Sequence, residues 1–233
     1  MNIPGRLLGL SIAAALVGLS APVLSSTGEV THLSGTLSVR KSDGSVRILA
    51  QRSEIQSGDT LNTERDSYAQ VKFPDGGQLP LKPNTSVKLD DFRFAEEKPQ
   101  DDAFLFSLVK GGLRAITGLV GRRSRDKYQL TTATATVGIR GTTFSADDCE
   151  SSACGSLQAG VYVSVADGEV VVQNSQGELA LAAGQFGLVE RNQRPLFLST
   201  DPGIAFTPPA TFLQSVMAGQ LGRKYLECVV ATK

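Results

Sequence analysis

The segment from Thr131 to Phe144, TTATATVGIRGTTF, restricts the possible folds of this chain more than any other stretch. Its threonines and valines are β-branched and suit the pleated, half-buried surface of a sheet. Glycine permits backbone angles that are closed to other residues, so the chain can turn sharply within this run. We therefore predict a strand, a tight corner and a second strand, with Gly138, Arg140, Gly141 and Thr142 as the structural hallmark.

Arg140 stands between the two glycines of that corner. A guanidinium presents five N–H donors in a fixed geometry, which suits several carbonyl acceptors at once. We interpret Arg140 as a structural residue that ties together the carbonyls of the loop.

The rest of the chain reads as short apolar runs separated by Gly, Asp and Asn, the pattern of a β protein. The first candidate strands are Val30 to Val39, Val46 to Leu49, Ala69 to Phe73, Gln78 to Leu81, Val87 to Phe92 and Phe104 to Val109. A weak internal repeat is also present, because the glycines at 35 and 44 have the same spacing as those at 168 and 177. We predict an all-β domain over residues 28–190, built as an antiparallel β-sandwich or a short β-solenoid.

One hairpin is predicted in more detail. Apolar and polar residues alternate from Ala69 to Phe73, and Asp75-Gly76-Gly77 then turns the chain into Gln78 to Leu81. Prolines at 74, 80 and 83 remove hydrogen-bond donors. We therefore expect this hairpin to lie at a sheet edge or to bend at its ends.

In the segment from Thr131 to Phe144 the chain resembles the FecR domain, whose hallmark has the form T-P-x-A-x-V-G-V-R-G-T-x-F. Thr132 stands where that pattern often has proline. Further similarity lies in GDTLNT at 58–63, AQVKFPDG from 69, DGEVVV at 167–172 and AGQ at 183–185. The resemblance implies an interaction or regulatory domain. The best-known members are membrane-spanning regulators. Their cytoplasmic segment controls a sigma factor, and their periplasmic part receives a signal from an outer-membrane receptor.

Residues 1–25 resemble an export signal, with Arg6 followed by an apolar run from Leu7 to Leu19 and then small residues. The run is short for a membrane span, which needs about 20 residues. We expect a cleaved signal peptide and a periplasmic or secreted protein. The alternative is that the segment is not cleaved and anchors the protein, and we expect membrane contact only in that case. Few residues precede the apolar run, so we do not expect direct control of a sigma factor. Of the two functions known for the FecR family, we expect only the periplasmic one to apply.

The three cysteines fit that compartment. Cys149 and Cys154 flank four residues between two predicted strands, so they could close a small disulfide loop in an oxidising space. Cys228 is then left over, either as a buried apolar thiol or as an intermolecular bridge.

The composition changes towards the C-terminus. Residues 191–210 contain several prolines and are predicted to be a linker. In residues 211–230, apolar side chains recur at intervals of three and four, which predicts an amphipathic helix. That helix would dock on its own β domain, on a partner, or on a second copy, where it or Cys228 would build a homodimer.

No constellation of residues points to catalysis. The chain has one histidine, His32, in a predicted strand, which excludes a multi-histidine metal site, and we expect neither cofactor nor metal. Net charge is zero and Trp is absent, so nucleic acid is not an expected partner. The basic run from Gly121 to Lys127 is interpreted as an exposed loop, or alternatively as a site for an acidic partner.

Three functions are compatible with these features. The first is a non-catalytic, exported FecR-type interaction module that contacts an envelope protein in sensing or regulation. The second is a carbohydrate- or cell-wall-binding module, although sugar platforms usually present Trp or Tyr. The third is a structural role as a dimer.

Overall fold

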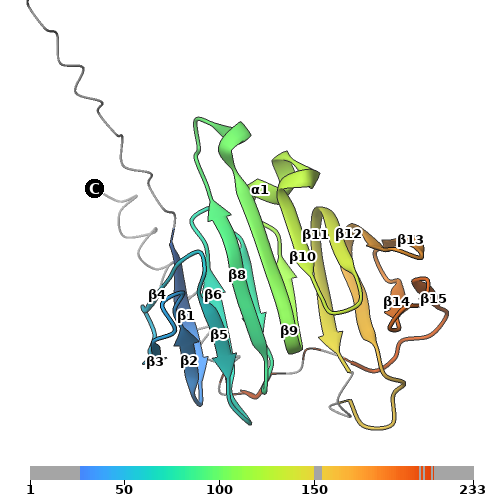
Figure 1. Cartoon of the computed structure of the whole chain (residues 1–233), viewed down its shortest axis with the longest axis horizontal. Coiled ribbons are helices and arrows are strands. Elements are labelled where there is room, and N and C mark those ends of the chain that lie inside the picture. Colours follow the sequence, from blue (N-terminus) through green and yellow to red (C-terminus); the bar gives the residue numbers. More distant parts are fainter. Residues whose placement is uncertain (1–26, 150–153, 205, 207, 211, 213–233) are drawn as a thin grey trace, which may run out of the picture.

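The computed structural model describes residues 27–149, 154–204, 206, 208–210 and 212. The fold is all-β, as predicted, and one continuous sheet contains fifteen strands that follow one another along the longest axis of the molecule (Figure 1). The strands are β1 (Gly28–Ser34), β2 (Leu37–Arg40), β3 (Val46–Leu49), β4 (Glu54–Ile55), β5 (Thr60–Thr63), β6 (Tyr68–Lys72), β7 (Gln78–Leu81), β8 (Ser86–Arg93), β9 (Ala103–Ile116), β10 (Tyr128–Thr131), β11 (Thr136–Asp148), β12 (Val161–Asn174), β13 (Gly177–Ala182), β14 (Phe186–Val189) and β15 (Leu196–Leu198). Three short helical segments complete the fold: η1 (Pro99–Asp101), α1 (Leu119–Arg123) and η2 (Arg125–Lys127).

Three long strands, β9, β11 and β12, divide the sheet into two layers because each changes its neighbours half-way along. The first half of β9 pairs with β8 and β10, whereas its second half pairs with β7 and β11. Likewise β12 pairs with β14 through its first half and with β13 through its second. We call the part that contains β2, β3, β5, β8, β10 and β13 the first layer, and the part that contains β1, β4, β6, β7, β14 and β15 the second layer.

Glycines with positive φ mark the corners at which these strands pass between layers. Gly111 in β9 has a φ of 82°, Gly141 in β11 a φ of 58° and Gly168 in β12 a φ of 80°. Gly35, at 83°, separates β1 from β2 in the same way. Such left-handed conformations strain residues with a Cβ, which explains why glycine stands at each corner. The fold therefore joins facing layers, as in a sandwich, with a chain that coils between them, as in a solenoid.

The two layers enclose a single apolar core. Phe73, at the end of β6 in the second layer, contacts Phe92 and Phe104 of the first layer, with ring centroids 4.8 and 4.6 Å apart. Phe104 also stacks on Tyr128, at 4.7 Å with an interplanar angle of 5°. The core continues from Val30 near the start of the sheet to Val189 near its far end, so the layers cannot be separated without exposing it.

Several predicted details differ in the structure. The run from Val30 to Val39 is divided into β1 and β2 at Gly35. The predicted hairpin is present as β6 and β7, but β7 lies between β6 and β9 and is not an edge strand. Pro80 is accommodated there because β7 pairs with β9 only at Gln78 and Leu81.

The sheet also extends beyond residue 190. β15 pairs with β14 within the segment that the sequence predicts as a Pro-rich linker. The predicted signal peptide, most of the predicted C-terminal helix, and Cys228 lie outside the described residues.

Candidate binding surfaces

The hallmark segment forms the corner of β11. The register of β11 against β12 shifts between Arg140 and Thr143, and Gly141 lies at that shift with its positive φ. Thr142 is buried, and its N–H donates to the Thr117 hydroxyl at 3.1 Å. The Thr117 hydroxyl and N–H both donate to the Thr142 carbonyl, at 2.5 and 3.0 Å. These bonds fix the corner to the end of β9.

The corners of β11 and β12 touch each other through backbone atoms. A Cβ built on Gly168 would lie 2.7 Å from Thr142 Cγ2 and 2.8 Å from the Gly141 carbonyl oxygen. Neither approach is possible for a real side chain, so Gly168 is required by sterics as well as by its φ.

Gly138 behaves differently from Gly141. It has no positive φ, and a Cβ built on it would meet only the Val171 carbonyl oxygen, at 3.9 Å. The backbone freedom that the sequence suggests for both glycines is therefore used only at Gly141. Neither its conformation nor its packing against the described side chains requires glycine at 138.

The missing side chain of Gly138 leaves a hollow of about 250 Å³ on the outer face of the first layer. Its walls come from β10, β11, β12 and η2, and they include the carboxylates of Asp126 and Glu169. Carboxamides of Gln129 and Gln173 and the side chain of Val171 complete a mixed polar and apolar lining. Arg140 pairs with Glu169 in the strand register, but its side chain lies outside what the structure describes, so its predicted clamping role stays a prediction.

The predicted disulfide between Cys149 and Cys154 is present in the structure. Cys149 follows directly on β11 and is buried with Tyr162 and Leu188 in a second apolar cluster, separate from the main core. Tyr162 also donates its hydroxyl to the Gln158 carbonyl, at 2.9 Å. The disulfide thus closes the β11–β12 loop over the outer face of the second layer.

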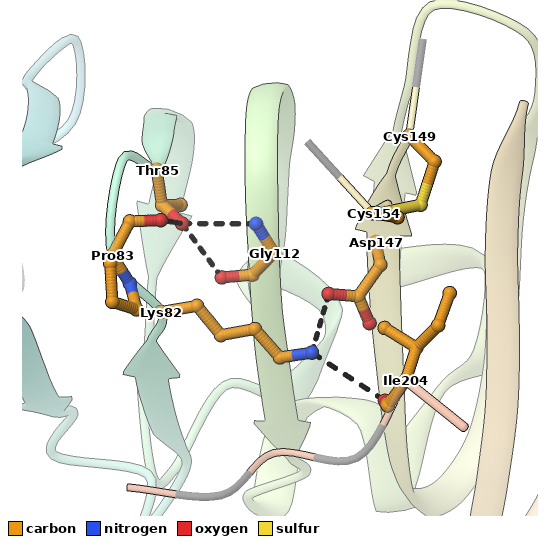
Figure 2. Close-up of polar contacts among 8 residues, drawn as sticks. All are labelled: Lys82, Pro83, Thr85, Gly112, Asp147, Cys149, Cys154 and Ile204. Atoms are coloured by element: carbon orange, nitrogen blue, oxygen red, sulfur yellow. Dashed lines mark hydrogen bonds and ion pairs between the residues drawn. A yellow bond between two sulfur atoms is a disulfide. The ribbon is translucent and has the colours of Figure 1, made fainter. Parts of the chain in front are cut away.

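A cleft of about 650 Å³ lies beside this loop, next to the Gly111 corner of β9. Figure 2 shows Lys82 reaching across β9 to Asp147 of β11, with 2.6 Å between Nζ and Oδ1. The side chain of Lys82 is 15% exposed and that of Asp147 is 8% exposed. Burial raises the pKa of Asp147 to about 6, although the Lys82 ammonium lowers it. The neighbouring Thr85 hydroxyl donates to the Gly112 carbonyl and accepts from the Gly112 N–H, both at 2.9 Å.

The basic run lies on α1 and η2, and part of its charge is engaged within the chain. Arg123 lies 3.7 Å from the buried Asp102 carboxylate and 5.7 Å from the ring centroid of Phe94. Lys127 donates to the Gln100 carbonyl, at 3.1 Å. These contacts connect the run to the loop between β8 and β9.

The described residues form neither a metal-binding cluster nor a membrane-spanning helix. Within them, no three side chains of His, Cys, Asp or Glu come together in a way that could hold a metal ion. The same residues include no helix with the length and hydropathy to cross a bilayer. His32 lies in β1, where its ring packs edge-on against Phe212 with centroids 6.2 Å apart.

Comparison with known families identifies the domain. Residues 59–171, from the start of β5 to the second half of β12, match the model of the FecR protein family. The chain carries a FecR domain. The match includes the corners of β9, β11 and β12, at which these three strands pass between the layers. FecR membership supports a regulatory, non-catalytic class of protein.

Two crystal structures of a candidate anti-sigma factor from Parabacteroides distasonis ATCC 8503 are similar to this FecR protein. Both are 19% identical to it, with TM-scores of 0.46 and 0.45. Each alignment covers 61% of this chain and 60% of the other, so the chain spans about three fifths of their length. No curated protein matches the sequence.

The hallmark residues were found from sequence, but the Lys82–Asp147 pair was missed. The two residues are 65 positions apart, and no local pattern connects them. One weak signal existed: Asp147 alternates with the apolar Phe144 and Ala146 on β11, which places it on the outer face.

Proposed function

We propose that this chain is an exported FecR-type module that binds an envelope protein and acts in sensing or regulation without catalysing a reaction. The FecR match supports the regulatory class. The pattern of residues 1–25 supports export, and the Cys149–Cys154 disulfide suits an oxidising compartment.

The observation that carries the proposal is the hollow at Gly138. A glycine without a conformational or packing requirement inside the fold is explained if a partner needs the space above it. The hollow combines two carboxylates, two carboxamides and an apolar wall, a mixture suited to a protein side chain with a cationic end. We therefore place the partner contact on the outer face of the first layer.

The open ends of the sheet offer a second contact. β3 pairs only with β2 among the described strands, and its Val46 and Ile48 are 65% and 69% exposed. Exposed apolar residues on an edge strand favour pairing with a strand of another chain.

The test is capture of crosslinked partners from cells that express the tagged full-length chain. Wild type is compared with Gly138→Leu, which fills the hollow, and with Ser38→Leu, which adds a side chain of the same size on the outer face of β2. We expect wild type and Ser38→Leu to capture the same envelope protein, and Gly138→Leu to capture about tenfold less, a loss of about 1.4 kcal/mol in binding.

Equal melting temperatures of the three proteins would show that the comparison reports binding rather than folding. Recovery of no protein with wild type, together with sedimentation on purified peptidoglycan or polysaccharide, would instead establish the carbohydrate-binding alternative.

A further inference from the structure

The chain returns across its own second layer after β15. We call this returning segment the strap and define it by the described residues 199–204, 206, 208–210 and 212. Ile204 joins the apolar cluster around the disulfide, under β14 and β12. Phe206 and Phe212 contact Tyr68 of β6, at the opposite end of the layer, with ring centroids 6.3 and 6.0 Å apart. The described part of the strap thus contacts both ends of the second layer, and Figure 2 shows Ile204 beside Asp147 and the tip of Lys82.

The anchors of the strap are side chains. Phe212 is 3% exposed and packs on His32 as well as on Tyr68. The Ile204 carbonyl accepts a hydrogen bond from Lys82 Nζ at 3.5 Å, at the outer limit for such a bond. Between residues 199 and 204, this is the sole polar bond to the sheet in the described part of the chain.

A segment that lies across strands cannot use the sheet's backbone ladder. Among the described residues its contacts with the sheet are mainly apolar and aromatic, and another segment of the same chemistry can replace them. The cleft of about 650 Å³ around Lys82 and Gly112 stays open beside Ile204. A competing segment with a longer side chain at this point would therefore bury surface that the strap leaves exposed.

We propose that the strap is an internal ligand, and that the outer face of the second layer binds an extended aromatic peptide of the partner protein in its place. This inference rests on the proposed function and adds a second, regulated contact to it. Binding of the partner segment releases the strap from Tyr68 and from the cluster around the disulfide. The apparent affinity of the partner is lowered by the fraction of molecules in which the strap is docked.

A labelled synthetic peptide with the sequence of residues 199–212 is the probe, added to the full-length protein. The host variant Phe206→Ala/Phe212→Ala weakens the docking of its own strap, and the same variant with Tyr68→Ala also removes the receiving side chain. The peptide is titrated to about 1 mM, because a tethered segment has an effective concentration of that order. We expect the double variant to bind the peptide at least about tenfold more tightly than wild type, and the triple variant to lose this gain.

Equal affinity for wild type and the double variant, or no binding up to the highest concentration, would overturn the inference. If the double variant melts at a lower temperature than wild type, Ile204→Asp replaces it, because that change detaches the other anchor and leaves both phenylalanines in place. Capture of the envelope partner separates the two proposals: a partner captured normally by a protein that never binds the peptide removes the strap inference and leaves the proposed function standing. Peptide binding without any captured partner would show that the strap docks on this face as a replaceable ligand, and it would remove the proposed function.

Discussion

Gly138, Gly141 and Gly168 lie close together in the FecR domain, yet the structure gives each a different reason to be glycine. Gly141 and Gly168 have positive φ, and Gly168 also has backbone atoms of β11 where a Cβ would lie. Gly138 has neither constraint. The hallmark therefore contains one position that serves the corner and one that serves the surface.

Alanine substitutions should rank these three glycines. Gly138→Ala should leave the unfolding free energy unchanged or raise it by about 0.4–1 kcal/mol, because it restricts only the unfolded chain. Gly141→Ala should cost about 1–2 kcal/mol through its left-handed backbone. Gly168→Ala should cost more than Gly141→Ala, since it adds a clash with backbone. Urea unfolding with a constant m-value measures the series. A Gly138→Ala protein less stable than Gly141→Ala would contradict this account.

The hallmark residues could be identified from sequence because β-branched residues and glycines are local signals. Their separate roles could not, since φ and the distance to a neighbouring strand depend on β12, which is remote in the chain. Glycine at 138 and glycine at 141 are indistinguishable in the sequence.

At the scale of elements, the β11–β12 connection carries both the disulfide and the buried ion pair. Asp147 is the penultimate residue of β11, and Cys149 follows that strand. The disulfide holds the loop above the second layer, while Lys82 holds the end of β11 to β7. Two independent links therefore fix the same end of the molecule.

Reduction of the Cys149–Cys154 bond should lower the unfolding free energy by about 2 kcal/mol, the entropy of closing a loop this short in the unfolded chain. Intact mass spectrometry of unreduced protein should give a value lower by two hydrogens than the reduced chain. Free alkylation of both thiols in protein taken from an oxidising compartment would refute the bond.

The pKa of Asp147 predicts a specific pH dependence. Because burial raises it from 3.8 to about 6, the folded protein binds this proton more tightly than the unfolded chain. The stability contribution of Asp147 is therefore largest below about pH 4 and is lost as the pH rises through about 6, by up to about 3 kcal/mol. The difference in unfolding free energy between wild type and Asp147→Asn, measured from pH 4 to 8, should show this slope.

Lys82→Met provides the complementary test. Removing the ammonium leaves the burial of Asp147 without its opposing charge, so the pKa of that carboxyl should rise further above about 6. Carboxyl-carbon NMR titration measures it directly. An unchanged or lower pKa would show that Lys82 does not interact with Asp147 in solution.

The strand pattern was largely predictable at this scale, because alternation and turn residues are local. The β3, β6, β7 and β8 runs were predicted close to their observed bounds. β15 was missed because its three residues, which directly follow Pro195, carry no strand signal of their own and form a strand only by pairing with β14. The pairing of β9 with four other strands was hidden as well, because a corner at Gly111 divides one apolar run between two layers.

At the scale of the whole molecule, the single core should make both layers unfold together. Phe104→Ala removes a ring that contacts Phe73, Phe92, Phe106 and Tyr128, and should cost about 3–5 kcal/mol. Hydrogen exchange should accelerate equally in β8 of the first layer and β6 of the second. Val109→Ala on the same strand, 57% exposed, is the control and should change stability by less than about 0.5 kcal/mol. Selective exchange in one layer would mean that the layers are independent units.

The strap has one more consequence, for how the molecule can be held. β1 begins and β15 ends at opposite ends of the long axis (Figure 1), but the strap brings Phe212 back to within 6.2 Å of His32, ring to ring. Entry and exit of the described chain therefore share one pole. A tether attached before Gly28 or after Phe212 would hold the molecule at that end and leave the β13 to β15 end pointing away from the attachment point. For the same reason the domain could be inserted into a surface loop of another protein.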